Sequence, residues 1–223
     1  VLVKLARGLE WVAYRAATHV VALSPGMANG VQQRGISSER ISIIPNSCDV
    51  TLFDVPPECG YPIRAQLELS PDQPLVVYAG SYGLLNDLNY LVILASHMQS
   101  LIPQVRFLLI GDGVAKEQIL AKAGELGILN RTLWMWDPTP KKDMPNLMAA
   151  ATVMTSFFVP LKPMWKNSAN KFFDALAAGK PIVINYGDWQ ADLIEENDIG
   201  LVLPPEDPRR GAEMLAEYLA DPA

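Results

Sequence analysis

A lysine and an aspartate on one short predicted helix are the residues with the clearest chemical potential. They lie in KPMWKNSANKFFDALAAGKPIVI, residues 162–184, where Asp174 follows Lys171 by three residues and Asn170 by four, so all three share one side of a helix. A cation in the first helical turn opposes the helix dipole unless an anion lies between its amine and the free backbone N–H groups. Phosphate fits that description, and Asp174 has the reach to accept hydrogen bonds from sugar hydroxyls beside it. A solvated lysine in an ordinary Lys171–Asp174 pair explains the same spacing equally well.

Signals at both ends define this predicted helix. Ser168 is a favourable N-cap, and Gly179 followed by Pro181 is a favourable stop. Phe172 and Phe173 can turn toward a core while the polar residues point elsewhere. The polar side of the helix is therefore where we expect a ligand.

Composition restricts the kind of ligand. The chain of 223 residues has a net charge of -6, with 19% charged and 50% hydrophobic residues, which is enough for one large or two small domains with their own core. An acidic balance argues against general nucleic-acid binding. Lys162, Lys166 and Lys171 form a local basic cluster that suits one small anion better than a polymer.

The cysteines and histidines show no metal-binding pattern. Cys48 and Cys59 lack metal-ligand spacing, and His19 and His97 lie far apart, so we expect neither a metal nor another cofactor. A reduced intracellular compartment is the default for such cysteine usage. No apolar run reaches membrane-spanning length, and no signal peptide is visible. Because the chain begins inside a predicted helix, we expect it to be a fragment.

Hydrophobic periodicity predicts a small α/β unit at the start of the chain. Its expected elements are an amphipathic helix at 2–17, a short buried strand at 19–23, a helix from Ser24–Pro25 that Gly35 ends, and a strand at 41–44. Residues 45–60 contain three prolines and no periodicity, which predicts a linker between two domains.

After the linker, predicted strands and helices alternate six times. The expected strands cover residues 75–79, 105–110, 132–136, 153–158, 182–184 and 200–203. The expected helices cover residues 87–99, 115–126, 141–150, 170–178, 189–196 and 208–219. Because the strands are almost continuously apolar, we predict an α/β fold with a parallel sheet covered by helices on both faces. Ligands of such sheets bind beyond the carboxyl ends of the strands.

The loop after the first strand of that sheet is a candidate for phosphate. Its two glycines allow a tight turn and a close backbone approach, and Asn86 or Asp87 can cap the next helix. The residues we expect to contact a donor molecule there are Gly80, Ser81, Tyr82, Gly83 and Asn86. A plain β-to-α turn is the competing interpretation.

The loops after the next two strands carry weaker signals. Gly111-Asp112-Gly113 begins like a dinucleotide fingerprint, but Lys116 stands where the third glycine would be, which disfavours a redox cofactor. The stiff loop at 136–140 could frame a base or merely turn the chain. No Ser/His/Asp order, nucleophile elbow or metal motif appears, and we expect His97 to be packed, so a partner domain must supply the missing chemistry.

Six segments, in order, resemble the C-terminal half of retaining group 1 glycosyltransferases, which form glycosyltransferase family 4 and have the GT-B fold. They are ALSPGM (22–27), IIPNSCD (43–49), YAGSYG (78–83), LLIGDG (108–113), NKFFDALAAGKPIV (170–183) and ADLIEENDIGLVLPPED (191–207). The last two are the most specific. Within the family, the sequence is most similar to bacterial enzymes that build O-antigen, capsule or exopolysaccharide.

The resemblance implies two Rossmann-like domains that face a cleft, of which the C-terminal one holds a nucleotide-sugar. Residues 1–48 would be the remnant of the N-terminal, acceptor-binding domain with the interdomain linker. Residues 49–223 would be the donor-binding domain.

The resemblance also assigns roles to single residues. Of the family's two acidic residues eight apart, the one that holds the ribose hydroxyls falls on Asp174, and the one that contacts the donor sugar falls on Lys166, a departure from the family. The family's basic pair falls near Ser81 and Asn86, where both positive charges are missing. The donor diphosphate would lie at the helix start, on the backbone amides of Ala169, Asn170, Lys171 and Phe172, and we count Ser168 among the donor-binding residues as well.

These departures from the family lead to one hypothesis. Lys166 and Lys171 replace the missing positive charges from the opposite side of the site, because a leaving nucleoside diphosphate needs charge stabilisation when no metal is bound. We therefore assign Lys166 and Lys171 as the catalytic residues of this half.

The predicted activity is a metal-independent, retaining transfer of a hexose or N-acetylamino sugar from a nucleotide-sugar, with UDP as the expected nucleotide. The expected acceptor is a lipid-linked saccharide or polysaccharide precursor, and the expected location is the cytoplasm, with attachment to the inner face of the membrane left open. We expect the fragment alone to bind donor without catalysing transfer.

Other activities fit the same half of the fold. A GT-B epimerase or phosphorylase is one alternative, and a non-catalytic nucleotide-binding scaffold is another. A flavodoxin-like receiver or redox domain is disfavoured, because its acidic cluster and cofactor loop are missing.

Overall fold

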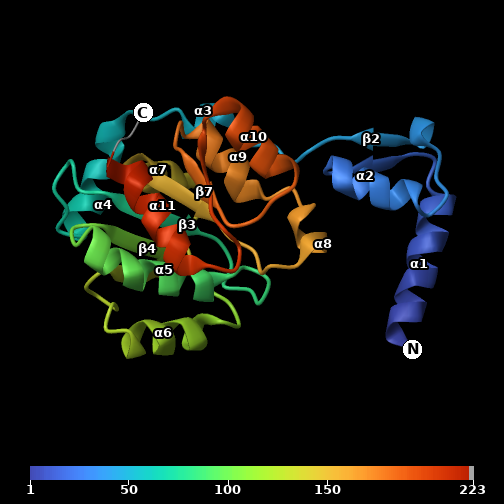
Figure 1. Cartoon of the computed structure of the whole chain (residues 1–223). Coiled ribbons are helices and arrows are strands. Elements are labelled where there is room, and N and C mark those ends of the chain that lie inside the picture. The colour runs from blue at the N-terminus through green and yellow to red at the C-terminus, as the bar shows by residue number, and fades with distance from the viewer. Residues whose placement is uncertain (221–223) are drawn as a thin grey trace.

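The computed structural model describes residues 1–220, which form a small N-terminal unit and a larger α/β domain (Figure 1). The N-terminal unit contains α1 (Leu2–Ala16), β1 (Val20–Ala22), α2 (Pro25–Gln32), the 3-10 turn η1 (Ser38–Arg40) and β2 (Ile41–Ile43). β1 and β2 pair in parallel and make a two-stranded sheet. Figure 1 shows this unit, in blue, joined to the larger domain by one extended segment.

The N-terminal unit forms the predicted elements but buries few of their residues, among them Ala22, Ala28 and Val31. None of the residues in α1 is buried, and Val21, in the strand expected to be buried, is 54% exposed. The prediction of a buried strand is therefore wrong, because a two-stranded sheet has too few neighbours to cover both of its faces. α2 begins as predicted, with the Ser24 hydroxyl accepting from the Met27 N–H at 3.0 Å and Pro25 in the first turn.

The segment predicted as a linker is partly helical. It contains α3 (Val50–Phe53), capped by Asp49, and the 3-10 turn η2 (Pro57–Gly60), which leads into α4 (Tyr61–Gln66). Phe53 is buried in the core of the larger domain, so α3 belongs to that domain rather than to a free connection. The division of the chain at residues 48 and 49 stays a prediction.

The larger domain contains a sheet of six parallel strands in the order β5-β4-β3-β6-β7-β8. The strands are β3 (Leu75–Ala79), β4 (Arg106–Ile110), β5 (Leu133–Trp136), β6 (Val153–Ser156), β7 (Ile182–Ile184) and β8 (Gly200–Val202). The helices are α5 (Leu88–Leu101), α6 (Lys116–Glu125), α7 (Met144–Ala150) after the turn η3 (Lys141–Asp143), α8 (Lys162–Trp165), α9 (Asn170–Ala177), α10 (Trp189–Asn197) and α11 (Pro208–Ala220). The prediction of a parallel sheet with helices on both faces is confirmed, whereas α4 and α8 were not predicted.

Alternation along the strands divides the core into two layers. In β3, Val76 and Tyr78 pack with α5, α6 and α11, while Leu75 and Val77 pack with α7, α9 and α10. Burying a large apolar side chain such as Phe107 stabilises the fold by about 1.5–3 kcal/mol. Within residues 1–220, no helix combines the length and the apolar character needed to cross a membrane.

The strand order reverses between β3 and β6. From β3 the chain moves outward to β4 and β5, and then returns to the other side of β3 to form β6, β7 and β8. A crevice forms at the carboxyl ends of the two strands where such an order reverses, and it is the usual ligand site of open parallel sheets. The loops after β3 and β6 therefore flank the expected site.

The pairing of β8 with β7 gives a test of this fold. A Cβ atom on Gly200, whose φ is +158°, would lie 1.9 Å from the carbonyl oxygen of Ile182, so we expect Gly200→Ala to lower the free energy of unfolding by about 3 kcal/mol. Gly124→Ala is the control, because Gly124 lies in α6 with open space around it, and there alanine should raise stability by about 0.5–1 kcal/mol. Urea unfolding followed by circular dichroism measures both, and equal stability of the two variants would contradict the strand pairing.

Candidate functional site

The loop between β3 and α5 is held together by its own polar side chains. The Asp87 carboxylate accepts from the Tyr90 N–H at 3.1 Å and caps α5, so Asp87 rather than Asn86 is the cap. The Asn86 side-chain amide instead donates to the carbonyl and hydroxyl oxygens of Ser81, at 3.0 and 3.2 Å. These bonds close the loop and leave the Asn86 oxygen available to another partner.

That partner is Lys171, from the first turn of α9. Its Nζ donates to the Asn86 side-chain oxygen at 3.3 Å and lies 5.0 Å and 5.4 Å from the ring centres of Tyr78 and Phe158. A Cβ atom at Gly80 would come within 3.1 Å of the Lys171 Cε, so the glycine leaves room for the lysine chain. Aromatic rings and a neutral amide thus surround the amine.

No carboxylate compensates this charge within residues 1–220. The Lys171–Asp174 pair that could have explained the spacing does not form, and burial alone lowers the pKa of Lys171 to about 8. A cation that is desolvated and lacks an anionic partner is an energetic cost to the empty fold. An anion bound at this position would remove that cost.

A cavity of about 330 Å³ lies at the carboxyl edge of the sheet beside this loop. Its lining residues come from the loops after β3, β4 and β5, and from α7 and α9, and they are Ala79, Gly80, Ser81, Ile110, Gly111, Asp112, Pro138, Thr139, Met144 and Asp174. Burial raises the pKa of the Asp174 carboxyl, and Lys141 acts in the opposite direction. All three loops that the sequence singled out therefore meet around one cavity.

The glycines after β4 bring two of these loops into contact. Gly111 has a φ of +152°, and a Cβ atom on it would lie 1.9 Å from the carbonyl oxygen of Gly80. A Cβ atom on Gly113 would lie 2.6 Å from the carbonyl oxygen of Tyr82, whose N–H donates to the Asp112 carbonyl at 2.8 Å. Close packing of two loops thus accounts for these glycines.

Tyr82 and Gly83, predicted to touch the donor, do not line this cavity. The Tyr82 side chain is fully buried in the core, and its backbone bonds the neighbouring loop. Gly83 lines a smaller cavity of about 180 Å³ on the other side of the loop, to which Asn86 also contributes. The sequence suggested a donor contact for both because they follow Gly80, but the chain turns away from the cavity after Ser81.

The start of α9 differs from the prediction. Ala169, not Ser168, occupies the N-cap position, and α9 has no side-chain cap. The Ser168 hydroxyl is buried and accepts from the Asn46 N–H at 3.0 Å, which is why it does not cap the helix. The Phe172 N–H already donates to the Ala169 carbonyl at 3.1 Å, so the amides of Ala169, Asn170 and Lys171 are the better candidates for an anion.

Lys166 has different surroundings from Lys171. Its carbonyl accepts a hydrogen bond from the Ser24 hydroxyl, and its aliphatic chain lies so close to Gly26 that a Cβ atom there would be 2.7–2.9 Å away. These contacts are with the N-terminal unit. The structure therefore assembles Gly80, Ser81, Asn86 and Lys171 but does not add Lys166 to them.

Several residues at the site were not predicted from the sequence. Tyr78 and Phe158 form the aromatic floor under Lys171, and Thr139 and Met144 line the cavity. Tyr78 and Phe158 looked like ordinary buried strand residues, so nothing in the pattern marked them. Within residues 1–220, no three His, Cys, Asp or Glu side chains gather as a metal site would require.

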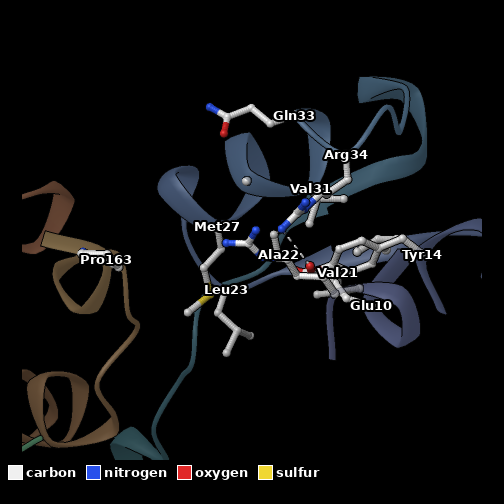
Figure 2. A pocket seen from close by; sticks show the side chains of 13 residues that line it. Glu10, Tyr14, Val21, Ala22, Leu23, Met27, Val31, Gln33, Arg34 and Pro163 are labelled. Carbon is white, nitrogen blue, oxygen red and sulfur yellow. Dashed lines mark hydrogen bonds and ion pairs between the residues drawn. The ribbon is translucent and has the colours of Figure 1, made fainter. Parts of the chain in front are cut away.

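A larger cavity of about 730 Å³ lies in the N-terminal unit (Figure 2). Figure 2 shows Glu10, Tyr14 and Arg34 together on one wall, where Arg34 pairs with Glu10 at 3.1 Å, and Pro163 of α8 on the opposite side of Met27. Arg7 also lines this cavity, so it contains one basic side chain besides the Arg34–Glu10 pair.

Comparisons with known proteins agree with this architecture. A family model described as "Glycosyl transferases group 1" matches residues 62–223. A curated relative, the D-inositol 3-phosphate glycosyltransferase of Xylanimonas cellulosilytica, is 26% identical over 204 residues, which are 86% of this chain and 46% of the relative. The chain thus spans about half the length of the curated relatives it matches.

Solved structures share the fold. The crystal structure of Anabaena Alr3699/HepE in complex with UDP and glucose superimposes with a TM-score of 0.79 at 22% identity, over 94% of this chain and 55% of that one. WaaG, described as a glycosyltransferase involved in lipopolysaccharide biosynthesis, gives a TM-score of 0.77 at 19% identity, over 99% and 61% of the two chains. On the match of the family model to residues 62–223, this chain belongs to the group 1 glycosyltransferases and contains the C-terminal domain of their GT-B fold.

Proposed function

We propose that this chain is the donor-binding part of a retaining glycosyltransferase. The whole enzyme would transfer a hexose or N-acetylamino sugar from a UDP-sugar to a lipid-linked saccharide or polysaccharide precursor. It would act in the cytoplasm, where the lipid-linked acceptor would place it at the inner face of the membrane. Because the chain spans about half of its relatives, we expect it to bind nucleotide alone without transferring sugar.

The observation that carries this proposal is the amine of Lys171. It comes from the first turn of α9, lacks a carboxylate partner among the described residues, and bonds the loop that closes one side of the cavity. Helix N–H groups and a nearby cation together favour an anion with several oxygens. A diphosphate between the start of α9 and the loop at Gly80 and Ser81 would meet both.

Lys171 does not itself line the cavity, and the cavity beside it suits the nucleoside. Its volume of about 330 Å³ falls within the range of small-molecule sites, and it lies at the carboxyl ends of β3 and β4, next to the point where the strand order reverses. Asp174 lines it one helical turn beyond Lys171, which supports the predicted bond from Asp174 to the ribose hydroxyls. Thr139 and Pro138, from the loop after β5, lie on its wall and would frame the base.

The chemical role of Lys171 follows from the charge that develops during transfer. When the bond between the anomeric carbon and the diphosphate oxygen breaks, its electron pair stays on the leaving diphosphate. A fixed cation and helix N–H groups lower the energy of that state without reorganisation. Because Lys166 packs against Gly26 of the N-terminal unit, we assign this stabilisation to Lys171 alone.

Related proteins supply the choice of nucleotide and acceptor. Structures of HepE contain UDP or UDP-glucose, and a structure of Staphylococcus aureus TarM contains UDP. WaaG is described as a glycosyltransferase involved in lipopolysaccharide biosynthesis. The curated relatives are named D-inositol 3-phosphate glycosyltransferases. These names support a UDP donor and a polar acceptor of the cell envelope.

Removal of the amine tests the donor site. We expect Lys171→Ala to weaken UDP binding about 10- to 100-fold, because charge-assisted hydrogen bonds contribute about 1.5–3 kcal/mol. Asp174→Ala should weaken UDP binding about 10-fold, because it removes the predicted hydrogen bonds to the ribose hydroxyls. Lys4→Ala removes the same charge from the exposed helix α1 and should leave binding unchanged. Isothermal titration measures all four proteins, and binding of UDP that is equal in Lys171→Ala and wild type would refute the proposal.

The lowered pKa of Lys171 predicts a dependence on pH. The amine is charged below its pKa of about 8 and neutral above it, so UDP affinity should be highest near pH 7 and should fall between pH 8 and pH 9.5. Phosphate ionisation near pH 6 lies below this window. Lys171→Arg keeps its charge at every pH and should abolish the decline. A decline of the same size in Lys171→Arg would assign the titration to another group.

A further inference from the structure

Asn46 connects the N-terminal unit to the residue that precedes the start of α9. Its backbone N–H donates to the Ser168 hydroxyl at 3.0 Å, and its side-chain amide donates to the Ser168 carbonyl. The two residues are 122 positions apart in the sequence. Ser168 is buried and directly precedes Ala169, the N-cap of α9.

Asn46 is tied to the N-terminal unit through the chain that precedes it. It follows β2, whose pairing with β1 is extended by a bond from the Ile44 N–H to the Ala22 carbonyl at 2.9 Å. Pro45 lies between and keeps the residue before it extended. Asn46 therefore lies two residues beyond the last hydrogen bond of this strand pair.

The whole segment before α9 is fixed in the same manner. The carbonyls of residues 166, 167 and 168 each accept one side-chain hydrogen bond, from Ser24, Trp189 and Asn46 in turn. Ser24 and Asn46 belong to the N-terminal side of the chain, and Trp189 belongs to α10 of the larger domain. Three elements thus determine the path of three consecutive residues.

The contacts of this segment affect the position of the first turn of α9. The helix has no side-chain cap of its own. Its first turn is held by the bond from Lys171 to Asn86, by the buried Phe172 and by the segment that enters the helix. The position of its first free N–H groups therefore depends in part on that segment. A shift of Ser168 would move the amides of Ala169 and Asn170 relative to the loop at Gly80.

We propose that Asn46 is a positioning residue for donor binding, because it holds the diphosphate-binding start of α9 in place from the N-terminal unit. This inference rests on the proposed function of that helix start. Asn46 itself touches neither the cavity nor Lys171, and it acts through Ser168. The donor site is therefore complete only when the N-terminal unit is docked.

The test compares UDP with uridine, because only UDP reaches the start of α9. We expect Asn46→Ala to weaken UDP binding about 5- to 20-fold and uridine binding less than 2-fold, measured by isothermal titration of the full chain. Asn29→Ala is the matched control, since it removes an exposed hydrogen bond to Gln33 on α2 and should change neither. A general loss of structure would weaken both ligands together.

If Asn46→Ala does not fold, variants of Ser168 test the same contact from its other side. Ser168→Ala removes only the acceptor of the Asn46 N–H and should weaken UDP binding about 3- to 5-fold, while Ser168→Thr retains a hydroxyl and should bind like the wild type. In the double variant with Lys171→Ala, the losses from Asn46→Ala and Lys171→Ala should be less than additive, because both act on one diphosphate site.

The results distinguish a failure of the positioning role of Asn46 from a failure of the proposed donor site. If the wild-type chain does not bind UDP, the donor site itself is refuted for this chain, and the positioning role with it. If the wild type binds UDP and Lys171→Ala weakens it, while Asn46→Ala and Ser168→Ala bind UDP normally or lose uridine equally, only the role of Asn46 is refuted.

Discussion

A parallel sheet must place the carboxyl ends of all its strands at one edge, and the candidate site of this protein depends on that constraint. Because the strand order reverses between β3 and β6, the helices after these strands leave the edge in opposite directions. The loop at Gly80 and Ser81 and the start of α9 therefore face each other across one crevice. Residues almost a hundred positions apart become neighbours without any special sequence between them.

Within this crevice, charge decides what can bind. Lys171 is partly buried against the rings of Tyr78 and Phe158 and the neutral oxygen of Asn86, and none of these neutralises its charge. A desolvated lysine without a carboxylate partner lowers the stability of the fold, and groups perturbed in this way are common at functional sites. In the proposed function, the lowered pKa of this amine is linked to the binding of an anion.

The same helix start shows how two parts of the chain share one site. The larger domain provides Lys171, Asp174 and the cavity, while the N-terminal unit fixes the segment at 166–168 through its own hydroxyl and amide groups. If the start of α9 binds the donor diphosphate as we propose, binding of the donor depends on the contacts of this segment with the N-terminal unit.

The sequence by itself determined the elements and their class, because apolar period, glycine stops and capping residues are local signals, and β3 and β7 were predicted to the residue. It also marked Lys171 and Asp174, whose spacing is a property of one helix. Only the tertiary structure decided that Lys171 meets Asn86, that Lys166 lies on Gly26, and that the Ser168 hydroxyl serves Asn46 instead of capping α9. These partners lie tens to more than a hundred residues away, so no local pattern encodes which of them a polar side chain will contact.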